Sequence, residues 1–164
     1  EVHAEFTMNK ATTATVINTT TPDPAYNQSG AQGWCNGIIG SSNRFNDGEW
    51  LGFNGKPFET VMQFNKTESL KNVQLHFFQS KGSWVYLPKS VEILSSMDGV
   101  NFTLVAKQDN FEKAKDGKFT LNIATPVAQA KYLKIIALPL DKIPAGNAGA
   151  GSPAWLFIDE VMVN

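Results

Sequence analysis

Short runs of apolar residues that alternate with polar ones, each bounded by turn residues, dominate this chain and favour strands over helices. Phe119, Leu121 and Ile123 alternate with polar neighbours, which is the two-residue period of a strand with one buried face. Asp98-Gly99 lies between two such runs and is a strong hairpin signal. The expected strands are 14–18, 60–64, 73–78, 91–95, 102–106, 119–123, 132–137 and 156–163. This pattern predicts an all-β fold, an antiparallel β-sandwich or eight-stranded jelly roll, with almost no helix.

Length and charge narrow the class of protein. A chain of 164 residues has the size of one domain, so we expect residues 1–164 to form a single domain. Lys and Arg number 14 and Asp and Glu 15, so the basic excess of a nucleic-acid binder is missing. No apolar run has the length of a transmembrane segment. Because the first residue is Glu, we expect a processed or excised fragment from which any signal peptide has been removed.

No catalytic constellation is visible in the sequence. Neither GxSxG nor HExxH occurs, and the single cysteine, Cys35, has no neighbouring histidine. His76 falls inside an expected strand and is interpreted as a sheet residue. Asp159 and Glu160 are adjacent in a strand, so we expect their side chains to point to opposite faces. Such a pair cannot flank one glycosidic bond, and we expect that this fragment is not an enzyme.

Two segments interrupt the strand pattern and are expected to be long loops. Residues 34–55 are rich in Gly, Asn and aromatic residues, and residues 141–153 are rich in Gly, Ala and Pro. Aromatic faces can stack on sugar rings, while planar polar groups pair with sugar hydroxyls. Taken singly, each of these aromatic residues is more typical of a sandwich core. The candidate ligand-binding residues are Arg44, Phe45, Asn46, Asp47, Trp84, Tyr86, Asn147 and Trp155.

The turn at residues 36–41 offers oxygen ligands of the kind that calcium prefers. Asn36 and Ser41 carry side-chain oxygens, and free carbonyls lie between them. Glu160 would add an anionic ligand if the last strand passes beside this turn. An ordinary tight turn accounts for the same Asn and Ser side chains without any ion.

Three blocks of sequence resemble a known family. NGIIGSSNRFNDGEWLGFNG, SWVYLPKSVEILSSMDGVNFTLV and AWLFIDEVMVN, in this order, resemble a factor V/VIII type C (discoidin-like) domain over nearly the whole chain, from about Asn9 to Asn164. The blocks are most similar to family 32 carbohydrate-binding modules appended to secreted bacterial β-N-acetylhexosaminidases (chitobiases) and β-galactosidases. The resemblance implies a galactose-binding-domain-like jelly roll, one structural calcium ion and a glycan site in the loops at one end.

The resemblance also assigns residues. It implies that Asn36, the carbonyl of Ile38, Ser41 and Glu160 are calcium ligands, although Asn36 stands where a carboxylate is usual. Asn147 stands in the Gly-rich loop where relatives often carry a histidine that contacts the sugar.

These observations lead to one functional hypothesis and two alternatives. We expect a non-catalytic module at the C-terminus of a larger glycoside hydrolase, a chitobiase, which it holds on galactose- or N-acetylhexosamine-type glycans. Its partners are then those glycans and the tethered catalytic domain, and its location is exported: periplasmic, cell-surface or secreted in a bacterium. The alternatives are a structural domain that packs on its catalytic domain without binding sugar, and an adhesion module for protein or membrane surfaces. The small number of Lys and Arg residues in the loops counts against adhesion.

Overall fold

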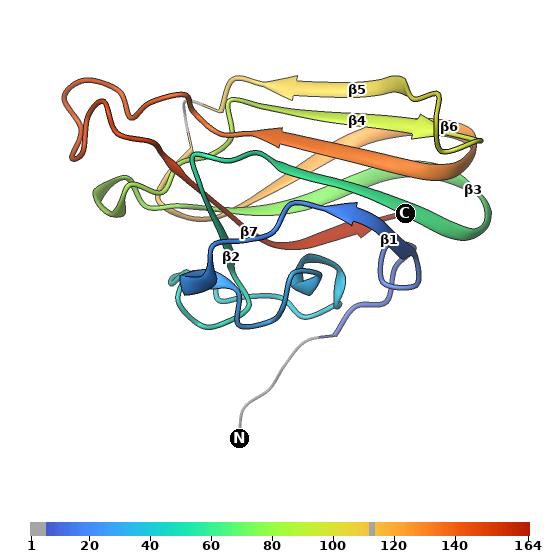
Figure 1. The fold of residues 1–164 in the computed structure, drawn as a ribbon, viewed down its shortest axis with the longest axis horizontal. Coiled ribbons are helices and arrows are strands. Elements are labelled where there is room, and N and C mark those ends of the chain that lie inside the picture. The colour runs from blue at the N-terminus through green and yellow to red at the C-terminus, as the bar shows by residue number, and fades with distance from the viewer. Residues whose placement is uncertain (1–5, 112–113) are drawn as a thin grey trace.

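The computed structural model describes residues 6–111 and 114–164, which form an antiparallel β-sandwich (Figure 1). Within those residues there are seven strands: β1 Thr15–Thr19, β2 Leu51–Asn54, β3 Phe58–Gln79, β4 Ser90–Ser96, β5 Thr103–Asp109, β6 Gly117–Leu138 and β7 Trp155–Val163. The same residues include three one-turn 3-10 helices: η1 Pro24–Tyr26, η2 Gly33–Cys35 and η3 Lys81–Ser83. None of the helices in the described part of the chain is long and apolar enough to cross a membrane.

β3 and β6 form one long antiparallel ribbon that belongs to both layers of the sandwich. Its first half pairs residues 58–63 with 132–137, and its second half pairs 72–79 with 117–124. The register shifts between these halves, where the ribbon turns from one layer to the other. β1, β4 and β5 extend the first half, whereas β7 and β2 extend the second. Four of the eight predicted strands are thus halves of β3 and β6, and the predicted fold class is confirmed.

The core lies between the two layers and follows the predicted alternation. Leu121 and Ile123 are buried, whereas Thr120 and Asn122 on the same strand are exposed. The largest fully buried side chains include Trp34, Trp50, Phe53, Phe58 and Phe77. Two of the four tryptophans therefore serve the core rather than a binding surface.

β2 lies inside the segment that the sequence predicted to be one long loop, so that prediction was wrong for residues 51–54. β2 pairs with the start of β7, from Leu51 opposite Ile158 to Asn54 opposite Trp155. Leu51, Gly52 and Phe53 are all buried, so this strand shows no apolar–polar alternation. A Cβ atom on Gly52 would lie 2.9 Å from the side chains of Tyr26 and Phe157, which explains the glycine in this strand.

A β-bulge in β7 changes the direction of two carboxylates. Leu75 pairs with Val161 and Phe77 pairs with Ile158, so Asp159 and Glu160 together oppose the single residue His76. Asp159 accepts a hydrogen bond from the Gly40 N–H at 2.6 Å, and Glu160 accepts from the Gly37 N–H at 3.2 and 3.3 Å. Both carboxylates therefore reach the same turn. The expectation that they point to opposite faces was wrong, because the bulge breaks the two-residue period.

Candidate functional site

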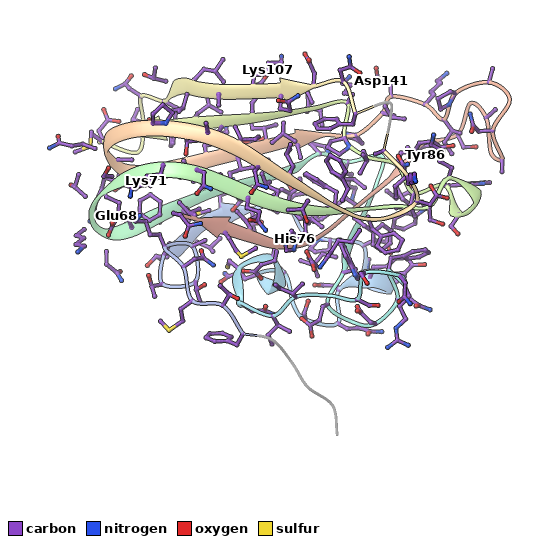
Figure 2. The ribbon with its side chains drawn as sticks, turned by 180° about the vertical axis from the view of Figure 1, so that it is seen from behind. Glu68, Lys71, His76, Tyr86, Lys107 and Asp141 are labelled. Carbon is purple, nitrogen blue, oxygen red and sulfur yellow. The ribbon has the colours of Figure 1, made fainter. Side chains whose placement is uncertain are left out.

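A pocket of about 460 Å³ lies at the end of the sandwich where the long connections gather. Figure 2 shows Tyr86 at this end and Glu68 and Lys71 at the opposite end, where the β3–β6 ribbon bends. We call this cavity the loop-end pocket. It is lined by Gln79, Lys81, Tyr86, Leu87, Pro88, Lys89, Asn110, Phe111, Leu140, Pro144 and Asn147.

Tyr86 is the most informative residue of the loop-end pocket. The residue is only 5% exposed, and its ring packs against Ile143 and Ala154. Its hydroxyl has no hydrogen-bond partner among the described residues. Burial, together with the nearby Asp116 carboxylate, raises the pKa of this phenol, so the hydroxyl keeps its proton. A buried hydroxyl without a protein partner carries a desolvation cost, which a hydrogen bond with a ligand would offset.

Two other polar side chains of the pocket wall form hydrogen bonds with the protein through only part of their amide groups. The Gln79 amide donates to the carbonyl of Ala114 at 2.8 Å. The Asn147 amide donates to the carbonyl of Pro144 at 3.3 Å, which leaves the Asn147 side-chain oxygen free to accept. These amides are the planar polar groups that sugar hydroxyls require.

Trp84 and Trp155 lie next to this pocket but differ in exposure. Trp84 follows η3 in the left-handed conformation, with φ 65°, and is 40% exposed. Its ring covers Gly149, two residues after Asn147 in the Gly-rich loop. Trp155 is half-buried, and its ring packs edge-on against Tyr26 at a centroid distance of 5.3 Å. Trp84 is therefore the tryptophan with an open face.

The candidate segment 44–47 lies apart from the loop-end pocket. Phe45 packs against Phe78 and Phe157, at centroid distances of 5.5 and 4.9 Å. The Asp47 carboxylate accepts hydrogen bonds from the N–H groups of Ser41 and Glu49 and so holds the turn together.

The structure thus divides the eight candidate ligand-binding residues. Tyr86 and Asn147 line the loop-end pocket, whereas Phe45 and Asn46 line a smaller cavity of about 70 Å³ together with Tyr26 and Trp50. Arg44 is exposed on the same connection, outside the lining of both cavities.

Sequence reasoning missed several lining residues, chiefly Lys81, Lys89, Asn110 and Phe111. They come from the connections before β4 and after β5, which the fold brings together from distant parts of the chain. No motif links them in sequence. One signal was available for Asn110, because asparagine tolerates a positive φ angle, here 67°, at the point where a strand ends.

The turn at residues 36–41 lies against the bulge of β7. Trp50 supports it by donating from its indole nitrogen to the carbonyl of Ser41 at 3.0 Å. Asn36 accepts from the Ile38 N–H at 2.7 Å and donates through its amide to the Glu49 carboxylate at 3.2 Å. The Ser41 hydroxyl donates to the side-chain oxygen of Asn43 at 2.7 Å. Oxygen atoms around this one turn thus come from four side chains: Asn36, Ser41, Asn43 and Glu49.

Glu160 closes this turn with a fully buried carboxylate. Burial raises the pKa of Glu160 to about 9; the carboxylates of Asp159 and Glu49 raise it as well, and the hydrogen bond from Gly37 lowers it. A buried carboxylate next to two further carboxylates, among oxygen donors, is chemistry that suits a hard cation such as calcium. Within residues 6–111 and 114–164, however, no three His, Cys, Asp or Glu side chains converge in a metal-binding arrangement.

Two residues with possible chemistry are inert in this setting. Burial, followed by the effect of Glu160, raises the pKa of Cys35 to about 12, so its thiol is not a nucleophile at neutral pH. His76 is buried in β3, with Nδ1 3.2 Å from an oxygen of Asp159 and Nε2 2.8 Å from the Gln74 amide. Both ring nitrogens thus face protein groups rather than solvent.

The fold and its loop-end pocket define a class: antiparallel β-sandwiches that present a pocket between the connections at one end. The sequence profile of the F5/8 type C domain matches residues 17–152, and the chain belongs to this family. No curated protein shows significant sequence similarity to it.

Several solved structures share the fold. The C-terminal domain of a chitobiase from Bacteroides fragilis is 19% identical, with a TM-score of 0.54 over 94% of this chain and 95% of that one. A family 32 carbohydrate-binding module from Clostridium perfringens, in complex with GalNAc-β-1,3-galactose, is 14% identical, with a TM-score of 0.58 over 98% and 99% of the two chains. The family 32 module of NanJ from the same organism, in complex with galactose, is 18% identical, with a TM-score of 0.56 over 98% and 96%.

Proposed function

We propose that this chain is a non-catalytic carbohydrate-binding module that holds one sugar unit of a glycan in the loop-end pocket. The observation that carries this proposal is the hydroxyl of Tyr86, which has no hydrogen-bond partner among the described residues and belongs to a side chain that lines a pocket of mixed apolar and polar residues. The sugar-bound relatives support galactose- or N-acetylhexosamine-type glycans as the ligand class.

Each part of the pocket has a separate role in this proposal. Tyr86 donates or accepts a hydrogen bond with a sugar hydroxyl, and Asn147 accepts another. The open face of Trp84 stacks on the ring of the sugar or of its neighbour in the glycan. A shallow site for one sugar gains about 4–5 kcal/mol after the cost of ordering, which corresponds to a Kd of about 0.1–1 mM.

Weak binding of this kind acts through a tether. We propose that the module belongs to an exported glycoside hydrolase, of which the chitobiase that carries a similar domain is an example. Binding near the substrate raises the effective concentration of the attached catalytic domain without new contacts to it. This chain's own residues then position the enzyme and carry out no chemistry.

Titration calorimetry or NMR tests the sugar site. We expect galactose, N-acetylgalactosamine or N-acetylglucosamine to bind the wild type, and we expect Tyr86→Phe and Trp84→Ala each to weaken binding several-fold. Val100→Ala is the matched control, because Val100 is an exposed apolar residue at the tip of the β4–β5 hairpin, at the opposite end of the sandwich. If the wild type binds none of the three sugars, or both variants bind as the wild type does, the proposal is wrong.

We also propose that the turn at residues 36–41 holds one calcium ion through Asn36, the carbonyl of Ile38, Ser41 and Glu160. Glu49 compensates for the missing carboxylate at position 36, because its side chain accepts a hydrogen bond from the Asn36 amide. An ion that binds only the folded chain stabilises it by about 2.7 kcal/mol at 100 times its Kd.

Thermal unfolding tests the ion site. We expect calcium to raise the Tm by about 5–10 °C relative to chelator, since 1 kcal/mol shifts the Tm of a chain of this size by about 2–4 °C. Glu160→Gln should abolish that shift and Glu49→Gln should reduce it, whereas Glu68→Gln, at the bend of the ribbon, should leave it unchanged. If calcium does not change the Tm of the wild type, the proposed calcium site is wrong.

A further inference from the structure

The charged side chains among the described lining residues of the loop-end pocket are all basic. Lys81 and Lys89 are its ionisable side chains apart from Tyr86 in the part of the chain that the structure describes. The Lys89 ammonium forms an ion pair with Asp141 at 2.6 Å, and this pair connects the wall to the Gly-rich loop. Lys89 is therefore largely neutralised by its own protein partner.

Lys81 has no such partner among the described residues. Asp116, outside the pocket lining, accepts a hydrogen bond from the backbone N–H of Lys81 at 3.4 Å and not from its ammonium. Lys81 is exposed and stands at the start of η3, before Trp84 and Tyr86. One unpaired cation and one unpartnered hydroxyl thus belong to the same wall.

These two groups select among sugars. A sugar that carries an ammonium group meets the unpaired ammonium of Lys81, which disfavours it. A neutral sugar can use the Tyr86 hydroxyl but leaves the Lys81 ammonium without a partner. A sugar carboxylate can accept a hydrogen bond from the Tyr86 hydroxyl and pair with the Lys81 ammonium.

We propose that the loop-end pocket recognises a carboxylate-bearing sugar, with Lys81 as the residue that determines this specificity and Tyr86 as the hydrogen-bond donor beside it. This inference rests on the proposed sugar-binding function and narrows its ligand class. Uronic acids and sialic acids are the two sources of such a carboxylate, and separate arms of the test distinguish them.

Galactose and galacturonic acid form the matched pair of ligands, because they differ only in the group at C6. At low ionic strength we expect galacturonate to bind the wild type about three- to tenfold more tightly than galactose, the range of a partly exposed charge-assisted contact. Added salt should shrink this preference, because it screens exposed charges. A parallel titration uses N-acetylneuraminic acid. If sialic acid is the source of the recognised carboxylate, this sugar binds more tightly than galacturonate.

Lys81→Gln should remove the preference for the acidic sugar, measured as the ratio of the galacturonate and galactose affinities of the same variant. Lys66→Gln, at the bend of the ribbon, is the control for a general loss of positive charge. Equal affinity of the wild type for the acidic sugars and galactose overturns this inference but leaves the proposed function intact. A preference that persists in Lys81→Gln overturns the role of Lys81. A wild type that binds none of these sugars and neither N-acetylgalactosamine nor N-acetylglucosamine overturns the proposed function itself.

Discussion

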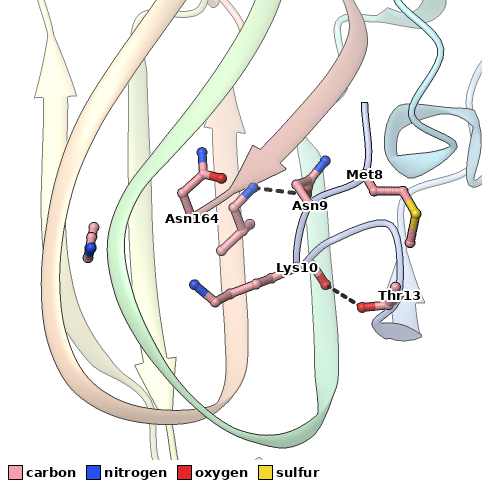
Figure 3. A pocket seen from close by; sticks show the side chains of 7 residues that line it. Met8, Asn9, Lys10, Thr13 and Asn164 are labelled. Carbon is pink, nitrogen blue, oxygen red and sulfur yellow. Dashed lines mark hydrogen bonds between the residues drawn. The ribbon is translucent and has the colours of Figure 1, made fainter. Parts of the chain in front are cut away.

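The two ends of the sandwich carry cavities of nearly equal volume, about 460 Å³ at the loop end and about 440 Å³ at the end where the ribbon bends. Figure 3 shows the second, which we call the bend-end groove; it is lined by Met8, Asn9, Lys10, Thr13, Lys71, Val163 and Asn164. None of its described lining residues is aromatic, and Asn9 accepts from the N–H groups of Ala11 and Val163 at 2.8 and 3.1 Å. The lining of the loop-end pocket instead includes two aromatic residues, Tyr86 and Phe111, and the Tyr86 hydroxyl has no hydrogen-bond partner among the described residues. Cavity volume alone therefore does not distinguish the two ends, whereas aromatic lining and a polar group without a partner do.

The largest expected effect concerns how the core supports the loop end. Trp50 is fully buried, packs edge-on against Phe78 at a centroid distance of 5.2 Å and holds the turn through Ser41. We expect Trp50→Ala to lower the free energy of unfolding by about 3–5 kcal/mol in chemical denaturation. Met8→Ala in the bend-end groove is the counterpart, with an expected change within about 0.5 kcal/mol because Met8 is 68% exposed. Similar losses in both variants would contradict the difference between the two ends.

A second substitution tests whether the polar groups of the bend-end groove are structural. Asn9→Ala leaves the N–H groups of Ala11 and Val163 without their acceptor. We expect it to lower the free energy of unfolding by about 1–3 kcal/mol, the cost of unsatisfied groups that are partly buried. Sugar affinity should stay as in the wild type. A loss of sugar affinity in a folded Asn9→Ala protein would place the binding site at the wrong end.

At the loop end, Tyr86→Phe should change the free energy of unfolding in the opposite direction. Because the Tyr86 hydroxyl has no hydrogen-bond partner among the described residues, its removal eliminates a desolvation cost. We expect the free energy of unfolding to rise by about 1 kcal/mol while sugar binding weakens. Denaturation and titration of the same preparation check both parts. A destabilised variant would show that the hydroxyl already has a partner in solution.

The smallest expected effect is on the pH dependence of stability, through Asp98 in the β4–β5 turn at the bend end. Hydrogen bonds from Asn101, Val100 and Ser96 hold the pKa of the Asp98 carboxyl well below its usual range. A lowered pKa stabilises the folded chain fully at pH values above the unfolded pKa of about 3.9, and this contribution decreases as the pH falls from that value through the lower folded-state pKa. We expect Asp98→Asn to lower the urea midpoint slightly at pH 7 and to differ less from the wild type at pH 2. A difference between the two proteins that does not depend on pH would contradict this explanation.

The sequence predicted most of the fold because the alternation of apolar and polar residues is a local signal. It predicted every strand but β2, in which Leu51, Gly52 and Phe53 are buried together and the alternation is absent. The direction of Asp159 was also not predictable. A bulge depends on the pairing of β7 with β3, which no single strand reveals.

The candidate site was predicted less completely, for a related reason. Tyr86 and Asn147 were named as candidates, and the fold places both in the loop-end pocket. Lys81 and Phe111 were missed, because their proximity arises only when the connections before β4 and after β5 meet. Aromatic residues were also ambiguous in sequence, since a buried residue such as Trp34 and an exposed one such as Trp84 look alike.

The long ribbon of β3 and β6 has a consequence for the kinetics of folding. Its pairs join distant parts of the chain, from Gln79 opposite Gly117 to Phe58 opposite Ala137, so each must close a long loop before it is stabilised. Folds dominated by such non-local pairs fold in about milliseconds to seconds. The β4–β5 hairpin, closed by Asp98-Gly99, is the local element that can form first and shorten the search. Since both layers share the ribbon, neither sheet can be completed alone, and the two halves of the sandwich should form in one cooperative step.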